Sequence, residues 1–437
     1  AQNMLGRCYE EGWGVAKNES EAVSCYQKAA EQGQVNAKHN LAVCCFYGRG
    51  LKEDKAKAVK WFTKAAERGF ASAQNWLGHC YENGFGVTKD ETEAVKWYKK
   101  AAELNYTVAQ YSLAICYENG FGVTKDETEA IKWYKKAAEE GLAVAQYNLA
   151  NCYLNGIGVS ENNEEAVEWL TKAAEQGHEG AQNMLGRCYE ECWGVEKNES
   201  EAAKWYKKAA EQGLAVAQCN LANCYFYGRG VSVNKSEAVK WFMKAAEQGD
   251  AEAQNMLGRC YEESWGVEKN EGKAVRWYRK AAEQGLAVAQ YNLAECFFYG
   301  RGVNENKAEA FKWYKSSAEQ GVSDAQFEVG NYYTYNRGID RDEKEAFKWY
   351  KLAAAQGHGG AQFESAYCYF YGKGVSENKE KAFELLKRAA EQGHDGAQRM
   401  LKREFNVSIG QQAAAQSSGC LLPVIGLLAI IMFIIAL

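Results

Sequence analysis

Apolar positions recur with a helical period along most of this chain. In residues 73–108, Ala73, Leu77, Cys80 and Tyr81 are spaced so that they fall on one face of a helix. A second apolar stripe follows in the same stretch, formed by Ala94, Trp97, Tyr98, Ala101 and Ala102. The pattern therefore predicts two amphipathic helices.

Glycine and capping residues indicate where these helices end and begin. Gly84 and Gly86 are expected to stop the first helix. Asp90 can cap the second helix, and Glu93, three residues later, completes a predicted capping box. Asn105 follows the second helix, where other copies have a glycine such as Gly33, Gly69 or Gly141. Because Asn tolerates the left-handed conformation best after Gly, this exception supports a left-handed helix end.

The two-helix pattern repeats every 36 residues without an insertion. Eleven copies fill residues 1–396, and a twelfth, incomplete copy begins at Ala397. We number the copies one to eleven and the places within a copy from its first alanine, which stands at Ala1, Ala37, Ala73, Ala109, Ala145, Ala181, Ala217, Ala253, Ala289, Ala325 and Ala361. Repeats of this length are typical of a solenoid, so we predict one elongated all-α domain.

The repeated residues resemble the Sel-one-like repeat family, which is related to tetratricopeptide repeats. In copy eight the motif consists of Ala253, Leu257, Gly258, Tyr261, Gly266, Val267, Ala274, Trp277, Tyr278, Lys280, Ala281, Ala282, Glu283 and Gly285. The resemblance covers nearly all of residues 1–396. It implies a right-handed superhelix of antiparallel helix pairs that assembles other proteins. Members of the family include adaptors of endoplasmic-reticulum-associated degradation, chitin synthase activators and bacterial host-interaction factors.

Differences among the copies gather on the first helix, at places 3, 7, 10 and 11, which we expect to line an inner groove. Place 10 is Glu in some copies and Phe in others, and the residue at place 13 changes with it. Copies with Glu carry an aromatic residue there, and copies with Phe carry a base. We interpret this swap as one aromatic slot that is filled from either side.

Two explanations of the slot remain open at this stage. It is either packing between helix and loop, or part of a recognition surface for an extended or helical protein partner. In the second case we expect the partner to be bound by Phe46, Phe226, Phe298, Phe370, Arg7, Arg187 and Arg259.

Cysteine and histidine place limits on the chemistry of the chain. Ten of the 15 cysteines share place 8, and Tyr332 takes that place in copy ten. Neighbouring helices pack too far apart for a disulfide between copies, so we expect core thiols. His178, His358 and His394 lie one or more copies apart, and we predict no metal site. The Gly-x-Gly-Val loops resemble phosphate-binding loops, but those follow a strand, whereas these loops end a helix. We therefore predict no cofactor, no small-molecule substrate and no enzyme activity.

The net charge of −5 argues against electrostatic binding of nucleic acid, so we do not expect nucleic acid as a partner.

Composition changes sharply after the repeats. Residues 397–405 form a predicted capping half-repeat, residues 406–419 an uncharged polar linker, and Cys420 to Leu437 an almost wholly apolar stretch. Eighteen such residues approach the thickness of a bilayer, so we predict a transmembrane tail.

The tail leaves two localisations open. In the first, it anchors cytosolic repeats to a membrane, which the many unpaired thiols favour. In the second, the repeats lie in the endoplasmic reticulum lumen or at the cell surface, where the tail spans the membrane or is replaced by a lipid anchor. The chain starts without Met on the first residue of a copy, and we expect either a fragment or a chain cut from a longer precursor. The sequence thus predicts a non-catalytic scaffold for protein partners, with a lumenal degradation adaptor or a lipid-anchored surface protein as the alternative.

Overall fold

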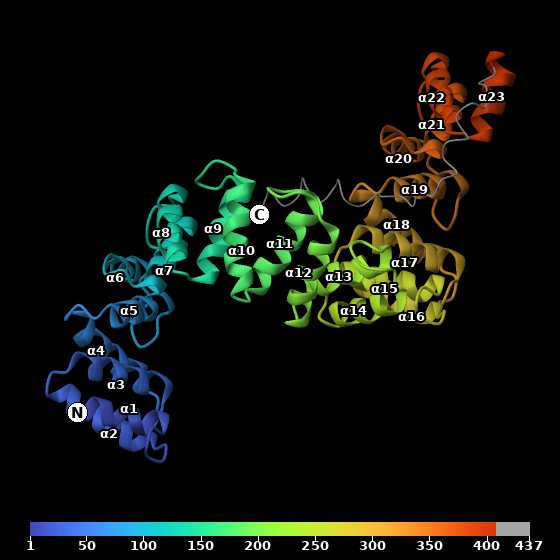
Figure 1. The fold of residues 1–437 in the computed structure, drawn as a ribbon. Helices are drawn as coiled ribbons and strands as arrows, with labels where there is room; N and C mark the ends of the chain where they lie inside the picture. Colours follow the sequence, from blue (N-terminus) through green and yellow to red (C-terminus); the bar gives the residue numbers. More distant parts are fainter. Residues whose placement is uncertain (408–437) are drawn as a thin grey trace. The chain divides into compact units, whose positions relative to one another are not determined.

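The computed structural model describes residues 1–407, and this part of the chain consists of α-helices joined by short turns (Figure 1). The 23 helices of residues 1–407 are α1 (Gln2–Glu11), α2 (Glu19–Glu31), α3 (Val35–Tyr47), α4 (Lys55–Ala66), α5 (Ala71–Asn83), α6 (Glu91–Glu103), α7 (Thr107–Asn119), α8 (Glu127–Glu139), α9 (Ala143–Asn155), α10 (Asn163–Glu175), α11 (Glu179–Glu191), α12 (Glu199–Glu211), α13 (Ala215–Tyr227), α14 (Lys235–Glu247), α15 (Ala251–Glu263), α16 (Glu271–Glu283), α17 (Ala287–Tyr299), α18 (Lys307–Glu319), α19 (Ser323–Tyr335), α20 (Glu343–Ala355), α21 (Gly359–Tyr371), α22 (Lys379–Glu391) and α23 (Asp395–Phe405). Odd-numbered helices are the first helices of the copies and even-numbered ones the second. The predicted all-α architecture of helix pairs is confirmed.

The predicted apolar faces form the core of each copy. On α5, the side chains of Ala73, Leu77 and Cys80 are at most 1% exposed. On α6, Tyr98 is 2% exposed and packs with the alanines around it. The hydrophobic period of the sequence therefore identified the buried sides of both helices.

Only one of the two hydrogen bonds of the predicted capping box is made at the start of the second helix. Asp90 accepts a hydrogen bond from the Glu93 backbone N–H at 3.0 Å, as expected of a cap. The return bond of the predicted capping box is not made. The Asp90 N–H donates instead to the carbonyl of Tyr81 at 2.9 Å, and the Glu93 carboxylate pairs with Lys96 at 2.5 Å. The backbone of the preceding helix thus replaces the side chain.

Turn residues adopt the conformations that the sequence predicted. Asn105 has a φ of 59°, in the left-handed region where Gly33 and Gly141 also lie. The second loop glycine is required for a different reason. At Gly122, whose φ is 66°, an added Cβ would lie 2.1 Å from the carbonyl oxygen of Glu91 in the preceding copy. Close approach of loop and helix explains why the copies keep glycine there.

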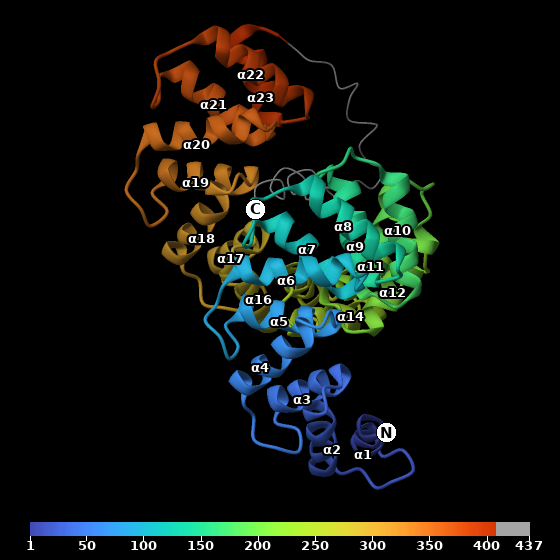
Figure 2. The same cartoon turned by 90° about the vertical axis from the view of Figure 1, so that its left-hand side faces the viewer.

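The chain divides into two compact units, residues 1–233 and residue 234 onward. The first unit contains α1 to α13, and the second contains α14 to α23 (Figure 2). Within each unit, every helix packs against the next one along the chain. In this way each copy covers the apolar face of its neighbour, as expected of a solenoid.

The last described helix has one apolar and one polar face. Helix α23 buries Ala397, Met400 and Leu401, and it exposes Lys402 and Glu404. The predicted linker lies almost wholly outside the described residues, and the predicted transmembrane segment, residues 420–437, lies outside them entirely. Among the helices of residues 1–407, none has the length and apolar character needed to cross a membrane.

Candidate functional site

The variable side chains of the first helices form a surface that we call the first-helix surface: places 3, 4, 7, 10 and 11 of each first helix, with place 13 of the following loop. The residues predicted to bind a partner lie here, with different exposure. Phe46 and Phe226 are each 7% exposed. Phe298 and Phe370 are half-buried, as are Arg187 and Arg259, whereas Arg7 is exposed.

Two of the phenylalanines at place 10, Phe46 and Phe298, pack against aromatic residues of the following copy. The ring of Phe46 lies 5.2 Å from Trp76 and 5.7 Å from Phe85, both in the following copy. Phe298 packs 5.9 Å from Tyr332, again in the following copy. These contacts support the explanation that the aromatic slot is packing. The slot lies between two successive copies and not within a single copy. Whether these phenylalanines and arginines bind a partner stays a prediction.

Glutamate at place 10 has a constant partner on the second helix. In five copies a buried tyrosine hydroxyl donates to this carboxylate at 2.6 to 2.8 Å, in the pairs Tyr26–Glu10, Tyr98–Glu82, Tyr134–Glu118, Tyr206–Glu190 and Tyr278–Glu262. Burial raises the pKa of Tyr206 and of Tyr278 well above the ordinary value of a tyrosine, and the carboxylate that each hydroxyl contacts raises it further. The hydroxyl therefore stays a donor, and it fixes the glutamate at the surface.

The base at place 13 explains why Glu and Phe alternate. Arg229 lies 2.9 Å from Glu190, and Arg301 lies 2.9 Å from Glu262, in each case a glutamate of the preceding copy. Arg49 makes the same pair with Glu10 at 3.6 Å. The interpretation of the swap as one slot within a copy was therefore incomplete. In copies two, seven and nine, which have Phe at place 10, the base therefore pairs with the acid of the preceding copy; copy eleven differs, because Lys373 follows a copy with Thr334 at place 10.

An amide contact joins the same pairs of copies. The Asn220 side chain donates to Asn183 at 2.9 Å, and Asn292 donates to Asn255 at 2.9 Å. Asn40 and Asn3 repeat this contact at 3.1 Å. The predicted binding residues Arg7, Arg187 and Arg259 each lie 5.0 to 5.1 Å from the centre of a tryptophan ring at place 13 of their own copy. Copies one and two, six and seven, and eight and nine thus form three equivalent two-copy modules.

An open pocket of about 350 Å³ lies between copies eight and nine. Its walls include Arg259, Glu262, Trp265, Asn292 and Arg301, so the module's own polar residues line it. Arg301 also donates to Glu295 at 3.2 Å, so it is paired with two carboxylates, whereas Arg259 lies over the ring of Trp265. Pairing fixes the side chains in place and leaves their polar edges facing the pocket.

Sequence analysis did not single out a set of exposed tyrosines on this surface. Place 11 is tyrosine wherever place 10 is Phe, and Tyr47, Tyr227 and Tyr299 are 51%, 41% and 61% exposed. The guanidinium at place 13 lies over each ring, with Arg49 5.0 Å from the Tyr47 centroid and Arg301 5.3 Å from that of Tyr299. The motif Phe-Tyr-Gly-Arg-Gly contained this signal, because one of two adjacent helical aromatics must point away from the core.

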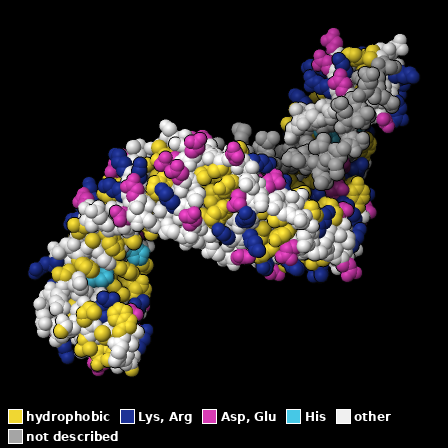
Figure 3. Space-filling view, in the orientation of Figure 1, with side chains coloured by type: hydrophobic (Ala, Val, Ile, Leu, Met, Phe, Trp, Pro, Cys, Tyr) yellow, Lys and Arg dark blue, Asp and Glu magenta, His cyan; other side chains and the backbone are white. Residues whose placement is uncertain are grey.

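The visible face of the molecule mixes charges of both signs with hydrophobic side chains (Figure 3). This mixture agrees with the small net charge of the sequence.

Comparison with known proteins identifies the repeats. The family model described as Sel1 repeat matches residues 1–34, 35–70, 71–106, 107–142, 143–178, 180–214, 215–250, 251–286, 287–322, 323–358 and 360–394. The chain belongs to the Sel1 repeat family. The resemblance drawn from the sequence is therefore confirmed, with eleven repeats. No curated protein matches the chain.

Solved structures of Sel1 repeat proteins have the same fold. A protective antigen present in uropathogenic Escherichia coli strains, which displays an SLR fold, is 34% identical, with a TM-score of 0.85 over 93% of this chain and 88% of that one. A Sel1 repeat protein from Oxalobacter formigenes is 29% identical, with a TM-score of 0.54 over 79% of this chain and 89% of that one. The predicted solenoid is confirmed.

Nine of the ten cysteines at place 8 are buried core residues of the repeats, and Cys8 is half-buried. Cys80, Cys116 and Cys260 are at most 2% exposed, and burial raises the pKa of each thiol to about 12. Such thiols stay protonated at neutral pH, which makes them poor nucleophiles.

The three histidines at the turns between copies act as helix caps. His178, His358 and His394 each accept a hydrogen bond from the backbone N–H three residues later, at 3.0 to 3.2 Å. Their rings also stack on an aromatic residue at place 3 of the same copy, with centroids 4.5 to 4.7 Å apart.

Proposed function

We propose that this Sel1 repeat chain is a non-catalytic scaffold that binds protein partners on its first-helix surface. The observation that carries the proposal is the repeated exposed tyrosine with an arginine over its ring, held on a frame of paired charges. Tyrosine and arginine are the residues that most often dominate the energy of protein interfaces. The frame lowers the entropic cost of binding, because Arg301 is already ordered by its two carboxylate partners before a partner arrives.

The exposed tyrosines are better test positions than the phenylalanines. Replacing Phe226 with Ala would remove a ring that is only 7% exposed and cost about 3–5 kcal/mol of stability, which would obscure any effect on binding. Tyr299 is 61% exposed, so its truncation should leave the fold intact.

The experiment begins by identifying a partner through proximity labelling in cells, followed by affinity measurements with both proteins purified. We expect Tyr299→Ala and Tyr47→Ala each to weaken binding by about tenfold or more, as hot-spot truncations do. Leu352→Ala is the matched control, because Leu352 is 44% exposed on the second helix α20. Equal affinities for the tyrosine variants and the wild-type chain, or an equal loss for Leu352→Ala, would contradict the proposal.

We further propose that residues 420–437 attach the scaffold to a membrane with the repeats in the cytosol. The support is the apolar composition of this segment alone. Deleting it should release the protein from carbonate-washed membranes, and the repeats should be digested by protease added outside intact vesicles. Protected repeats that shift on glycosidase treatment would instead favour the lumenal adaptor or the surface protein.

A further inference from the structure

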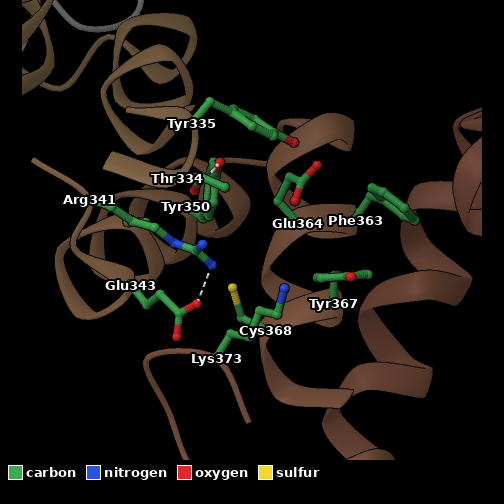
Figure 4. Close-up of a pocket in the computed structure, with 11 residues that line it drawn as sticks. Thr334, Tyr335, Arg341, Glu343, Tyr350, Phe363, Glu364, Tyr367, Cys368 and Lys373 are labelled. Carbon is green, nitrogen blue, oxygen red and sulfur yellow. Dashed lines mark hydrogen bonds and ion pairs between the residues drawn. The ribbon is translucent and has the colours of Figure 1, made fainter. Parts of the chain in front are cut away.

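A pocket of about 430 Å³ lies between copies ten and eleven, within the second unit. Its walls come from the end of α19, the start of α20 and the middle of α21. In Figure 4 the carboxylate of Glu364 faces this space, with the ring of Tyr335 on one side and that of Tyr367 on the other. Phe363 and the thiol of Cys368 also line it. The volume is within the range of small-ligand sites.

Glu364 lacks the partners that the same place has one copy earlier. Glu328, also at place 4, accepts from Arg337 at 3.1 Å and from Asn331 at 3.2 Å. In copy eleven these two donors are replaced by Lys373 and Tyr367. Neither of them forms a hydrogen bond or ion pair with Glu364, and the carboxylate has no such partner among residues 1–407.

The burial of Glu364 disfavours its negatively charged form. Burial raises the pKa of this carboxyl above its ordinary value, and Lys373 offsets only part of the effect. The Lys373 ammonium lies 4.9 Å from the centre of the Tyr367 ring, where a cation is attracted by the ring face. The pocket therefore already stabilises one cation beside an aromatic ring.

The remaining charges of the pocket are balanced. Arg341 is paired with Glu343 at 2.5 Å, which leaves it little attraction for an anionic ligand. The unpaired carboxylate and the exposed ring of Tyr335, which is 55% exposed, are thus the groups with unused binding capacity.

We propose that this pocket binds a cationic side chain, arginine or lysine, of a protein partner. Glu364 is the counter-ion, and the rings of Tyr335 and Tyr367 pack against the cation and its aliphatic stem. The proposal rests on the scaffold function and adds the chemistry of the partner. Lys373 occupies part of the site in the free chain, and its flexible stem lets it withdraw to solvent when the ligand enters.

The test is a titration of the full chain with arginine amide, followed by NMR, beside citrulline amide, whose side chain has nearly the same shape and carries no charge. We expect arginine amide to bind and citrulline amide to bind at least about tenfold more weakly. Glu364→Gln should weaken arginine amide binding by a similar factor. Glu328→Gln, which removes the same charge from the paired glutamate, should leave it unchanged. Thermal melting checks each fold, and Glu364→Gln should melt no lower than the wild-type chain because it removes a half-buried unpaired charge.

Lys373→Gln distinguishes a cation site from an anion site. If the ligand is a cation, this variant removes a competitor and binds arginine amide as well as the wild-type chain or better. Loss of binding in Lys373→Gln, unchanged binding in Glu364→Gln, or equal binding of the two amides would each overturn the proposal. None of these results would affect the scaffold proposal, which is tested at Tyr47 and Tyr299.

Discussion

The buried thiols at place 8 predict a loss of stability at alkaline pH that can be assigned to single residues. Cys116 is 2% exposed, and burial, reinforced by Glu82 and Glu91, raises its pKa from 9.0 to about 12. Between these two values the unfolded chain gives up the proton and the folded chain keeps it. The stabilising contribution of the thiol is therefore complete below pH 9 and is lost as the pH rises toward 12.

The magnitude follows from the two pKa values. At pH 10 the unfolded thiol is about nine-tenths ionised and the folded one almost wholly protonated, so linkage lowers the free energy of unfolding by about 1.4 kcal/mol per thiol. At pH 7.5 the same contribution is close to zero. Replacing Cys116 with Ala should cost about 1–2 kcal/mol at pH 7.5, because a buried sulfur is lost. At pH 10 the cost should be smaller by about 1.4 kcal/mol.

The assay is urea unfolding followed by circular dichroism, in reducing buffer, at both pH values. Other titrating groups, including the buried tyrosines, are common to the two proteins and cancel in the difference. Cys192→Ala is the control, because this cysteine is exposed and its removal deletes no buried thiol. If Cys116→Ala is destabilised equally at pH 7.5 and pH 10, burial does not raise the thiol pKa and the reasoning fails.

Further predictions concern the turns and the tyrosine pairs. Gly122→Ala should destabilise the chain by more than about 2 kcal/mol, because the left-handed conformation and the overlap with the Glu91 carbonyl both count against a side chain. Gly141→Ala, at a φ of 89° with open space around it, should cost only about 1–2 kcal/mol; equal losses in urea unfolding would show that close approach is not the cause. Tyr206→Phe removes the hydroxyl that donates to Glu190 at 2.6 Å and should cost about 1.5–3 kcal/mol in the same assay. An unchanged midpoint would mean that water replaces the hydroxyl.

Sequence reasoning succeeded where the signal and its consequence lie within one copy. The period of Ala73, Leu77 and Cys80 identified the buried face, and Asn105 identified a left-handed helix end. These outcomes depend on local backbone geometry and on which side of a helix is apolar. Both are properties of a few consecutive residues.

It failed where the consequence depends on the neighbouring copy. The alternation of Glu and Phe was visible, but the base at place 13 was matched with place 10 of its own copy, three residues away. In the structure Arg229 reaches Glu190, 39 residues earlier in the chain. For the same reason Phe226 is buried and the adjacent Tyr227 is exposed, since the next copy determines which of two consecutive side chains it covers.

The pairing between copies also shows why copies ten and eleven differ from the modules. In the three modules each acid at place 10 meets a base of the following copy, so the polar groups of the surface satisfy one another. Copies ten and eleven have Thr334 and Phe370 at this place, and their acids move to place 4. Arg337 satisfies the first of these acids, Glu328, whereas no residue between 1 and 407 forms a hydrogen bond or ion pair with Glu364. Stacking alone does not require this arrangement, because each of the three modules stacks with its acid at place 10 paired to a base. Glu364 is half-buried in the pocket between copies ten and eleven with no hydrogen-bond or ion-pair partner among residues 1–407, and a cationic ligand would supply the missing partner.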